Sequence, residues 1–175
     1  LLREREIESG RIDGFRLQFF NVFEAGAQAL LNEYVPLEGP FDHPPHILLV
    51  GFGNLGESLL LQMARRWSVN RSAAASPLRV TVVDRDADHK TESLCRRYPR
   101  LTEACQLVAR AIAVSGPPLQ GTEVLLGPDC DRDLTAAIVS LDDDSLALST
   151  ALTLRQELLG QDVPIIVPVE QATGL

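Results

Sequence analysis

Short apolar runs alternate with helix-like stretches along this chain from residue 46 onward. Runs that are apolar at nearly every position predict strands over 47–50, 79–83, 107–114, 134–141 and 163–169. The stretches between them predict helices over 54–67, 87–97 and 145–159. Strands that are apolar on both faces and alternate with helices are typical of a parallel sheet covered on both sides. The pattern therefore predicts an α/β fold built on a doubly wound parallel sheet.

A separate apolar stripe precedes this pattern and predicts a helix over 15–34. Its members, spaced by three or four residues, are Phe15, Phe19, Val22, Phe23, Ala27, Leu30 and Tyr34. This helix either packs on the domain that follows or couples that domain to an upstream domain or a second copy. Prolines at 36, 40, 44 and 45 then predict a stiff linker. We therefore expect an N-terminal helix and proline-rich linker over 1–43, and the main domain over 44–175.

The first strand runs directly into a G-x-G-x-x-G motif made by Gly51, Gly53 and Gly56. In that context the first glycine permits a sharp turn, the second lets the backbone approach a pyrophosphate, and the third lets the helix pack close to the strand. The helix that follows offers free N–H groups and a positive dipole end to phosphates. The motif predicts a Rossmann-like dinucleotide site. The alternative is a tight turn between strand and helix that binds no ligand.

Asp84 closes the second strand in the sequence RVTVVD. An acid at this place accepts hydrogen bonds from the adenosine ribose and repels a 2′-phosphate, so Asp84 favours NAD over NADP. Arg85 follows and can stack on adenine or, as a less favoured alternative, accept a 2′-phosphate. An exposed acid with no ligand is the other interpretation of Asp84.

An acidic cluster follows the fourth strand in the sequence SLDDD, from Ser140 to Asp144. Acids at the start of a helix act as caps and interact well with the helix dipole, and capping explains at least one of the three. The alternative is an edge that faces a ligand or a cation, because the carboxyl ends of parallel strands flank the ligand crevice. Adjacent acids in such a turn point in different directions, so we do not expect a catalytic pair.

The net charge of −8 argues against broad contact with nucleic acid, which requires clustered lysine and arginine. The cysteines, Cys95, Cys105 and Cys130, lack C-x-x-C spacing, and the three histidines do not pair at helical ligand spacing. We therefore expect no metal site. Unpaired cysteines suit a reducing compartment, where buried thiols pack as small apolar groups.

No catalytic set is visible in the sequence. Tyr34 and Tyr98 are followed four positions later by Glu38 and Thr102, so the Tyr-x-x-x-Lys pair of short-chain dehydrogenases is absent. The single lysine, Lys90, is the one candidate for lysine catalysis. No Ser/His/Asp arrangement and no G-x-x-x-x-G-K-[ST] motif occurs either. A dinucleotide motif without a catalytic set or a substrate domain indicates a sensor rather than an enzyme.

The chain has no signal peptide and no apolar run of transmembrane length, and it begins without methionine. We therefore expect a cytoplasmic piece of a longer protein whose remaining part can include a membrane anchor.

Several segments together resemble the regulator-of-potassium-conductance family, also called the TrkA N-terminal domain. They are GFGNLG after the first strand, VVDRD at the end of the second, and IVSLDDDSLALSTALTLRQ followed by VPIIVPV. The resemblance covers roughly residues 46–172, and its most specific part is the late segment with its acidic turn and Ala/Leu-rich helix.

This resemblance implies a domain that binds NAD(H), or alternatively ATP or ADP, and gates a potassium channel or transporter. The family assembles as dimers or larger rings attached to a membrane pore domain, so a homo-oligomer is expected. By motif, the diphosphate would be lined by Gly51, Gly53, Asn54, Leu55 and Gly56. Asp84 and Arg85 would contact the adenosine end, and Ser140, Leu141 and Asp142 the far end of the nucleotide.

Two other interpretations stay open. The chain is alternatively a fragment of an NAD-dependent oxidoreductase that has been separated from its substrate domain, which predicts hydride transfer by the longer protein. It is also consistent with a degenerate Rossmann module that serves as a dimerisation scaffold. A methyltransferase fits less well, because G-x-G-x-x-G at the start of a helix suits a pyrophosphate better.

Overall fold

A computed structural model describes residues 21–35, 37, 43–70, 76–114, 134–159 and 161–169. The elements in chain order are α1 (Val22–Tyr34), β1 (His46–Val50), α2 (Asn54–Asn70), β2 (Leu78–Asp84), α3 (Ala87–Arg97), α4 (Leu101–Ala104), β3 (Cys105–Ala111), β4 (Leu134–Val139), α6 (Asp144–Glu157) and β5 (Ile165–Ile166). The strands form one sheet in the order β3-β2-β1-β4-β5, and every pairing in it is parallel. The predicted Rossmann-like α/β fold is confirmed.

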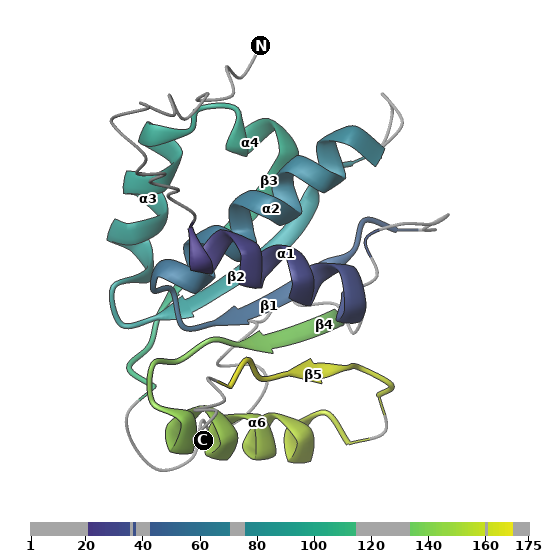
Figure 1. The fold of residues 1–175 in the computed structure, drawn as a ribbon, viewed down its shortest axis with the longest axis vertical. Coiled ribbons are helices and arrows are strands. Elements are labelled where there is room, and N and C mark those ends of the chain that lie inside the picture. Colours follow the sequence, from purple (N-terminus) through teal and green to yellow (C-terminus); the bar gives the residue numbers. More distant parts are fainter. Residues whose placement is uncertain are drawn as a thin grey trace, which may run out of the picture.

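Side chains of the central strands alternate between two cores, one on each face of the sheet. In β1, Ile47 and Leu49 belong to the larger core, which contains residues of α1, α2, α3 and α4. Leu48 and Val50 point to the opposite face, into the core that contains residues of α6. All five residues of β1 are therefore buried, as expected for the central strand of a doubly covered sheet. Figure 1 shows α1 and α2 crossing one side of the sheet, with α6 beside β4 and β5.

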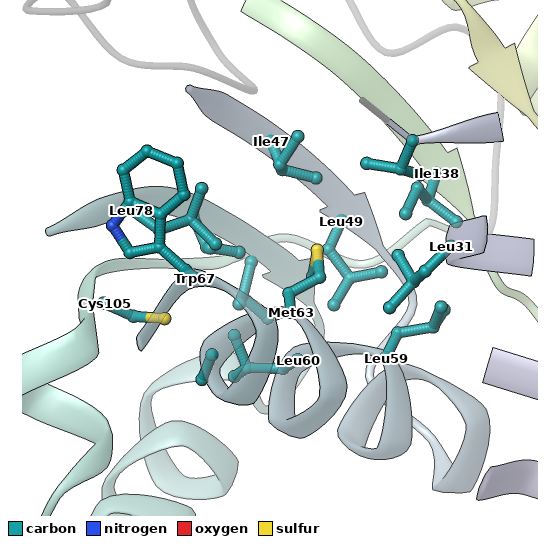
Figure 2. Packing of buried hydrophobic residues seen from close by; sticks show 14 of the residues in the cluster. Leu31, Ile47, Leu49, Leu59, Leu60, Met63, Trp67, Leu78, Cys105 and Ile138 are labelled. Atoms are coloured by element: carbon teal, nitrogen blue, oxygen red, sulfur yellow. The ribbon is translucent and has the colours of Figure 1, made fainter. Parts of the chain in front are cut away.

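Helix α1 packs on the domain that follows, which confirms one of the two interpretations of the N-terminal stripe. Ala27 and Leu31 are buried in the larger core, where Leu31 lies near Leu59 and Ile138 (Figure 2). At the helix surface, the Glu24 carboxylate accepts hydrogen bonds from Gln62 and Arg65 of α2 at 3.0 and 2.9 Å. Helix α1 is therefore an integral layer of the fold.

The predicted stripe was wrong in its detail. Val22, Phe23 and Tyr34 are exposed to solvent, whereas Leu31, which was not in the stripe, is buried. The surface of α1 that contacts the rest of the domain is narrower than the apolar face of this helix. Only Ala27 and Leu31, near the middle of that face, are fully buried. Phe15 and Phe19 lie outside the described residues, as do the serine- and alanine-rich positions 71–75 and residues 115–133.

Several predicted boundaries also need correction. The third strand covers Cys105–Ala111 rather than 107–114, because its partner β2 ends at Asp84, which pairs with Ala111. The fourth strand ends at Val139, two residues before the predicted end. The fifth covers only Ile165–Ile166 rather than 163–169, since Pro164 and Pro168 have no N–H to donate to the sheet. The short helix α4 was not predicted.

His46 at the start of β1 is a buried titratable group that links pH to stability. Its side chain is 2% exposed, and its Nε2 lies 2.9 Å from the Thr81 hydroxyl. Burial, aided by the charge of Arg79, lowers the pKa of His46 to about 4. In the unfolded chain the imidazole regains an ordinary pKa of about 6.5. Between these values the unfolded state binds the proton more readily, so stability rises with pH through this window.

We therefore expect the free energy of unfolding to fall by about 2 kcal/mol between pH 7.5 and pH 4.5 through this histidine alone. Urea unfolding at the two pH values measures this difference. The matched variant is His46→Gln, which keeps a polar side chain near Thr81 but does not titrate. An equally steep pH dependence in the variant would show that His46 is not its source.

Candidate functional site

The candidate site lies where the strand order reverses, between β1 and β4. In open parallel sheets, ligands bind outside the carboxyl ends of the strands at this switch point. The residues that follow the two strands are in direct contact there. The backbone N–H of Ser140 donates to the Val50 carbonyl at 2.8 Å, and the Ser140 hydroxyl donates to the Gly51 carbonyl at 2.9 Å. Hydrogen bonds thus join the turn after β1 to the turn after β4.

Gly51 is required by the fold itself. Its φ is +90°, a conformation that side chains rarely adopt. A Cβ placed on Gly51 would lie 2.4 Å from the carbonyl oxygen of Ser140. Its N–H donates to the Val83 carbonyl of β2 at 2.8 Å. The chain therefore turns through a space between β2 and β4 that has no room for a side chain, which confirms the predicted role of this glycine.

Gly56 is also required by packing. A Cβ at Gly56 would lie 2.6 Å from the Gly51 carbonyl oxygen, so only glycine lets the first turn of α2 approach the end of β1 this closely. The predicted role of the third glycine, close packing of helix against strand, is confirmed.

Gly53 differs from the other two glycines, because the described protein atoms leave room for a side chain there. A Cβ at Gly53 would have its nearest contact 3.6 Å away, at the Asp142 carboxylate oxygen Oδ1, which is an ordinary van der Waals distance. Its φ is not in the left-handed region. Among the described residues, neither steric packing nor backbone conformation thus demands a glycine at this position, although glycine is also a favourable residue just before a helix.

Gly53 also leaves the start of α2 without a side-chain cap of its own. The N-terminal N–H groups of a helix have no partners within the helix and are usually satisfied by a capping side chain. Asn21 caps α1 in this way, and Asp143 caps α6 with a hydrogen bond of 2.8 Å from Leu146 N. Gly53 precedes α2 and has no side chain that could accept such a bond. The first turn of α2 is suited to an external anion.

Asp84 ties the end of β2 to the glycine turn. Its Oδ2 accepts the backbone N–H of Phe52 at 2.9 Å, within the glycine motif. Its Oδ1 accepts the backbone N–H of Asp86 at 2.9 Å and the ammonium group of Lys90 at 2.8 Å. The carboxylate is thus held in one orientation at the edge where the sequence predicted a ribose contact.

Two opposing effects act on the pKa of Asp84. Burial favours the neutral acid and would raise the pKa, but the hydrogen bonds from Lys90, Asp86 and Phe52, together with the lysine charge, outweigh it. The net result is a pKa below the ordinary value, so Asp84 is ionised at neutral pH. The carboxylate is in the state that accepts hydrogen bonds from hydroxyl groups.

A cleft of about 260 Å³ opens at this edge of the sheet. Its walls are formed by Gly51, Asp84, Arg85, Asp86, Lys90, Val114, Leu141 and Leu146. Whole ligand sites usually measure about 300–1,000 Å³, so this cleft is slightly smaller than a complete site, and Gly51 forms part of its wall. It brings together four of the predicted groups: the first glycine, the acid, the arginine and Leu141.

The other predicted residues have different surroundings. The Ser140 hydroxyl is used within the protein, on the Gly51 carbonyl, and Asp142 is exposed beside Gly53. The Leu55 side chain packs against the larger core, so its backbone N–H is the group available to a ligand, while Asn54 is exposed. In the acidic cluster, Asp143 is the helix cap, as the capping interpretation predicted.

Sequence reasoning missed the roles of Phe52 and Lys90. Lys90 was considered only as a catalytic candidate, yet its ammonium group pairs with Asp84. Its position held a usable signal, because it lies in the first turn of α3, where the helix dipole disfavours a cation. A lysine at such a place suggests a nearby anion.

Within the described ranges, no group of three or more His, Cys, Asp or Glu residues could hold a metal ion. Cys95 is a free thiol, Cys105 is buried at the start of β3, and Cys130 lies outside those ranges. None of the described helices is both long and apolar enough to cross a bilayer.

Neither a scan against protein-family models nor a search of curated proteins found a match for this chain.

Proposed function

We propose that this chain is a regulatory domain that binds an adenine dinucleotide, NAD(H) first of all, at the switch point of its sheet. The observation that carries the proposal is Gly53, since packing accounts for Gly51 and Gly56 but leaves the middle glycine unexplained. A backbone free of Cβ beside an uncapped helix start is what close approach of a pyrophosphate requires. ATP and ADP share the diphosphate and adenosine groups and are the alternative ligands.

The residues present fit such a ligand in the cleft and at the start of α2, which follows the glycine turn. Backbone N–H groups from Gly53 to Gly56 would hold the diphosphate, because these groups precede the first bonds within α2. At the adenosine end, Asp84 would accept a ribose hydroxyl and Arg85 would lie against the base. Leu141, which lines the cleft, and Asp142, near Gly53, would border the far end of the ligand.

A regulatory role is supported by the resemblance of the sequence to a family of regulatory domains. The resemblance to the regulator-of-potassium-conductance family suggests a cytoplasmic domain that forms dimers or rings and acts on a potassium channel or transporter. Ligand binding can shift such an assembly only by favouring one arrangement over another. In this chain the Gly51–Gly56 turn joins β1, β2 and β4 through hydrogen bonds, so a bound nucleotide would stabilise three strands at once.

Unfolding in the presence of nucleotides tests this proposal. The chain is unfolded by urea alone and with NAD⁺, NADH, ATP or ADP. A ligand that binds the folded state at a hundred times its Kd should raise the free energy of unfolding by about 2.7 kcal/mol. Inosine, which has a ribose but no diphosphate, is the control and should have no comparable effect. No stabilisation by any of the four nucleotides would contradict the proposal.

A hydride-transfer assay separates this proposal from an oxidoreductase fragment. A regulatory domain should bind NADH without oxidising it, when small aldehydes and ketones are offered to the longest available form of the protein. Oxidation of NADH that depends on one of these substrates would favour the enzyme.

A further inference from the structure

The ion pair between Lys90 and Asp84 changes the electrostatics of the cleft. The two groups are 2.8 Å apart and line the same wall, together with Arg85 and Asp86. The Asp84 side chain is 14% exposed and that of Lys90 is 36% exposed, so the lysine is the more accessible partner.

The formal charges in this wall cancel. Asp84 and Asp86 contribute two negative charges, and Arg85 and Lys90 contribute two positive charges. An acid at the end of the second strand normally excludes a 2′-phosphate by repulsion. Here a cation lies in direct contact with that acid and a second cation follows it in sequence. The repulsion that would exclude a phosphorylated ribose is therefore offset.

The hydrogen bonds of Asp84 lead to the same result. A carboxylate has about four acceptor positions on its two oxygens. Three are taken, by Phe52 N, Asp86 N and Lys90. One position is left, enough for a single ribose hydroxyl, so most of the acceptor capacity of this carboxylate is used within the protein. Lys90 has three donors on a flexible stem, so it can keep one bond to Asp84 and offer another to a phosphate oxygen.

We propose that Lys90 lets the adenosine end of this cleft accept a 2′-phosphate, so that the protein binds NADP(H) as well as NAD(H). This inference rests on the proposed nucleotide site and makes Lys90 a residue that determines specificity within it. It removes the preference for NAD(H) that Asp84 alone predicts.

Fluorescence titrations with NADH and NADPH test the inference on the wild-type chain and two variants. The wild-type Kd values for the two ligands should agree within about tenfold, because the charges of the wall cancel. Lys90→Met removes the cation and should raise the ratio of the NADPH Kd to the NADH Kd by at least about tenfold. Lys90→Arg keeps the charge and should leave that ratio within about threefold of the wild-type value.

The outcomes of these titrations distinguish failure of this inference from failure of the nucleotide site. A wild-type chain that binds NADH but binds NADPH more than tenfold more weakly overturns this inference and leaves the nucleotide site intact. A smaller change of the ratio in Lys90→Met also overturns it. A chain that binds neither ligand overturns the nucleotide site and the inference with it. The wild-type comparison needs no variant to fold.

Discussion

Gly51→Ala is expected to destabilise the protein by about 3–5 kcal/mol, enough to prevent folding of a marginally stable domain. An alanine at this position must adopt a φ of +90°, and its Cβ would lie 2.4 Å from the Ser140 carbonyl oxygen. Backbone strain and overpacking each contribute, and the neighbouring atom is backbone, which cannot rotate away. Urea unfolding followed by circular dichroism measures the effect.

Gly26→Ala is the matched control for this substitution. Gly26 lies within α1, and a Cβ there would have nothing within 4 Å. The same chemical change should therefore stabilise the protein by about 0.5–1 kcal/mol through helix propensity. A Gly51→Ala protein as stable as the wild type would mean that the turn after β1 does not have this geometry.

Gly53→Ala is expected to differ from Gly51→Ala: it should leave the protein folded and should weaken ligand binding. The free energy of unfolding should fall by no more than about 1 kcal/mol, because the added methyl group meets only the Asp142 carboxylate at ordinary distance and alanine is a somewhat poorer residue than glycine just before a helix. NADH binding should weaken roughly 100-fold, since a methyl group that separates backbone from pyrophosphate costs one or two charge-assisted hydrogen bonds. Urea unfolding and fluorescence titration measure the two effects on the same preparation.

The contrast between two glycines of one motif makes this substitution informative. A turn that binds no ligand, or a module that serves only as a scaffold, predicts no change in either measurement. A large loss of stability in Gly53→Ala would mean that the fold itself requires this glycine. The main support for the nucleotide site would then be lost.

The central sheet was predictable from sequence because burial on both faces leaves an unambiguous apolar run. The five residues of β1 are all buried, and four of them were predicted as strand from their apolar character. Edge elements were less predictable. At β5 the apolar run is longer than the strand, because two prolines limit pairing to Ile165 and Ile166. Helix α4 has four residues, too few for periodicity to show.

The site was predictable only where a local motif specifies geometry. Gly51 and Gly56 were assigned structural roles from their spacing, and the distances confirm them. The bonds of Asp84 to Phe52 and Lys90 depend on where β2 lies relative to the glycine turn, which is a tertiary feature. Ser140 was expected near the ligand, yet its hydroxyl bonds the Gly51 carbonyl, since parallel pairing of β4 with β1 brings the two turns into contact.

Calorimetric titration of NADH into the wild-type chain and into Gly53→Ala, under identical conditions, measures directly whether Gly53 serves ligand binding. We expect saturable binding of one NADH per chain by the wild type, and a Kd roughly 100-fold higher for Gly53→Ala with little change in stability. Equal affinities in the two proteins, or no heat of binding in the wild type, would contradict this expectation.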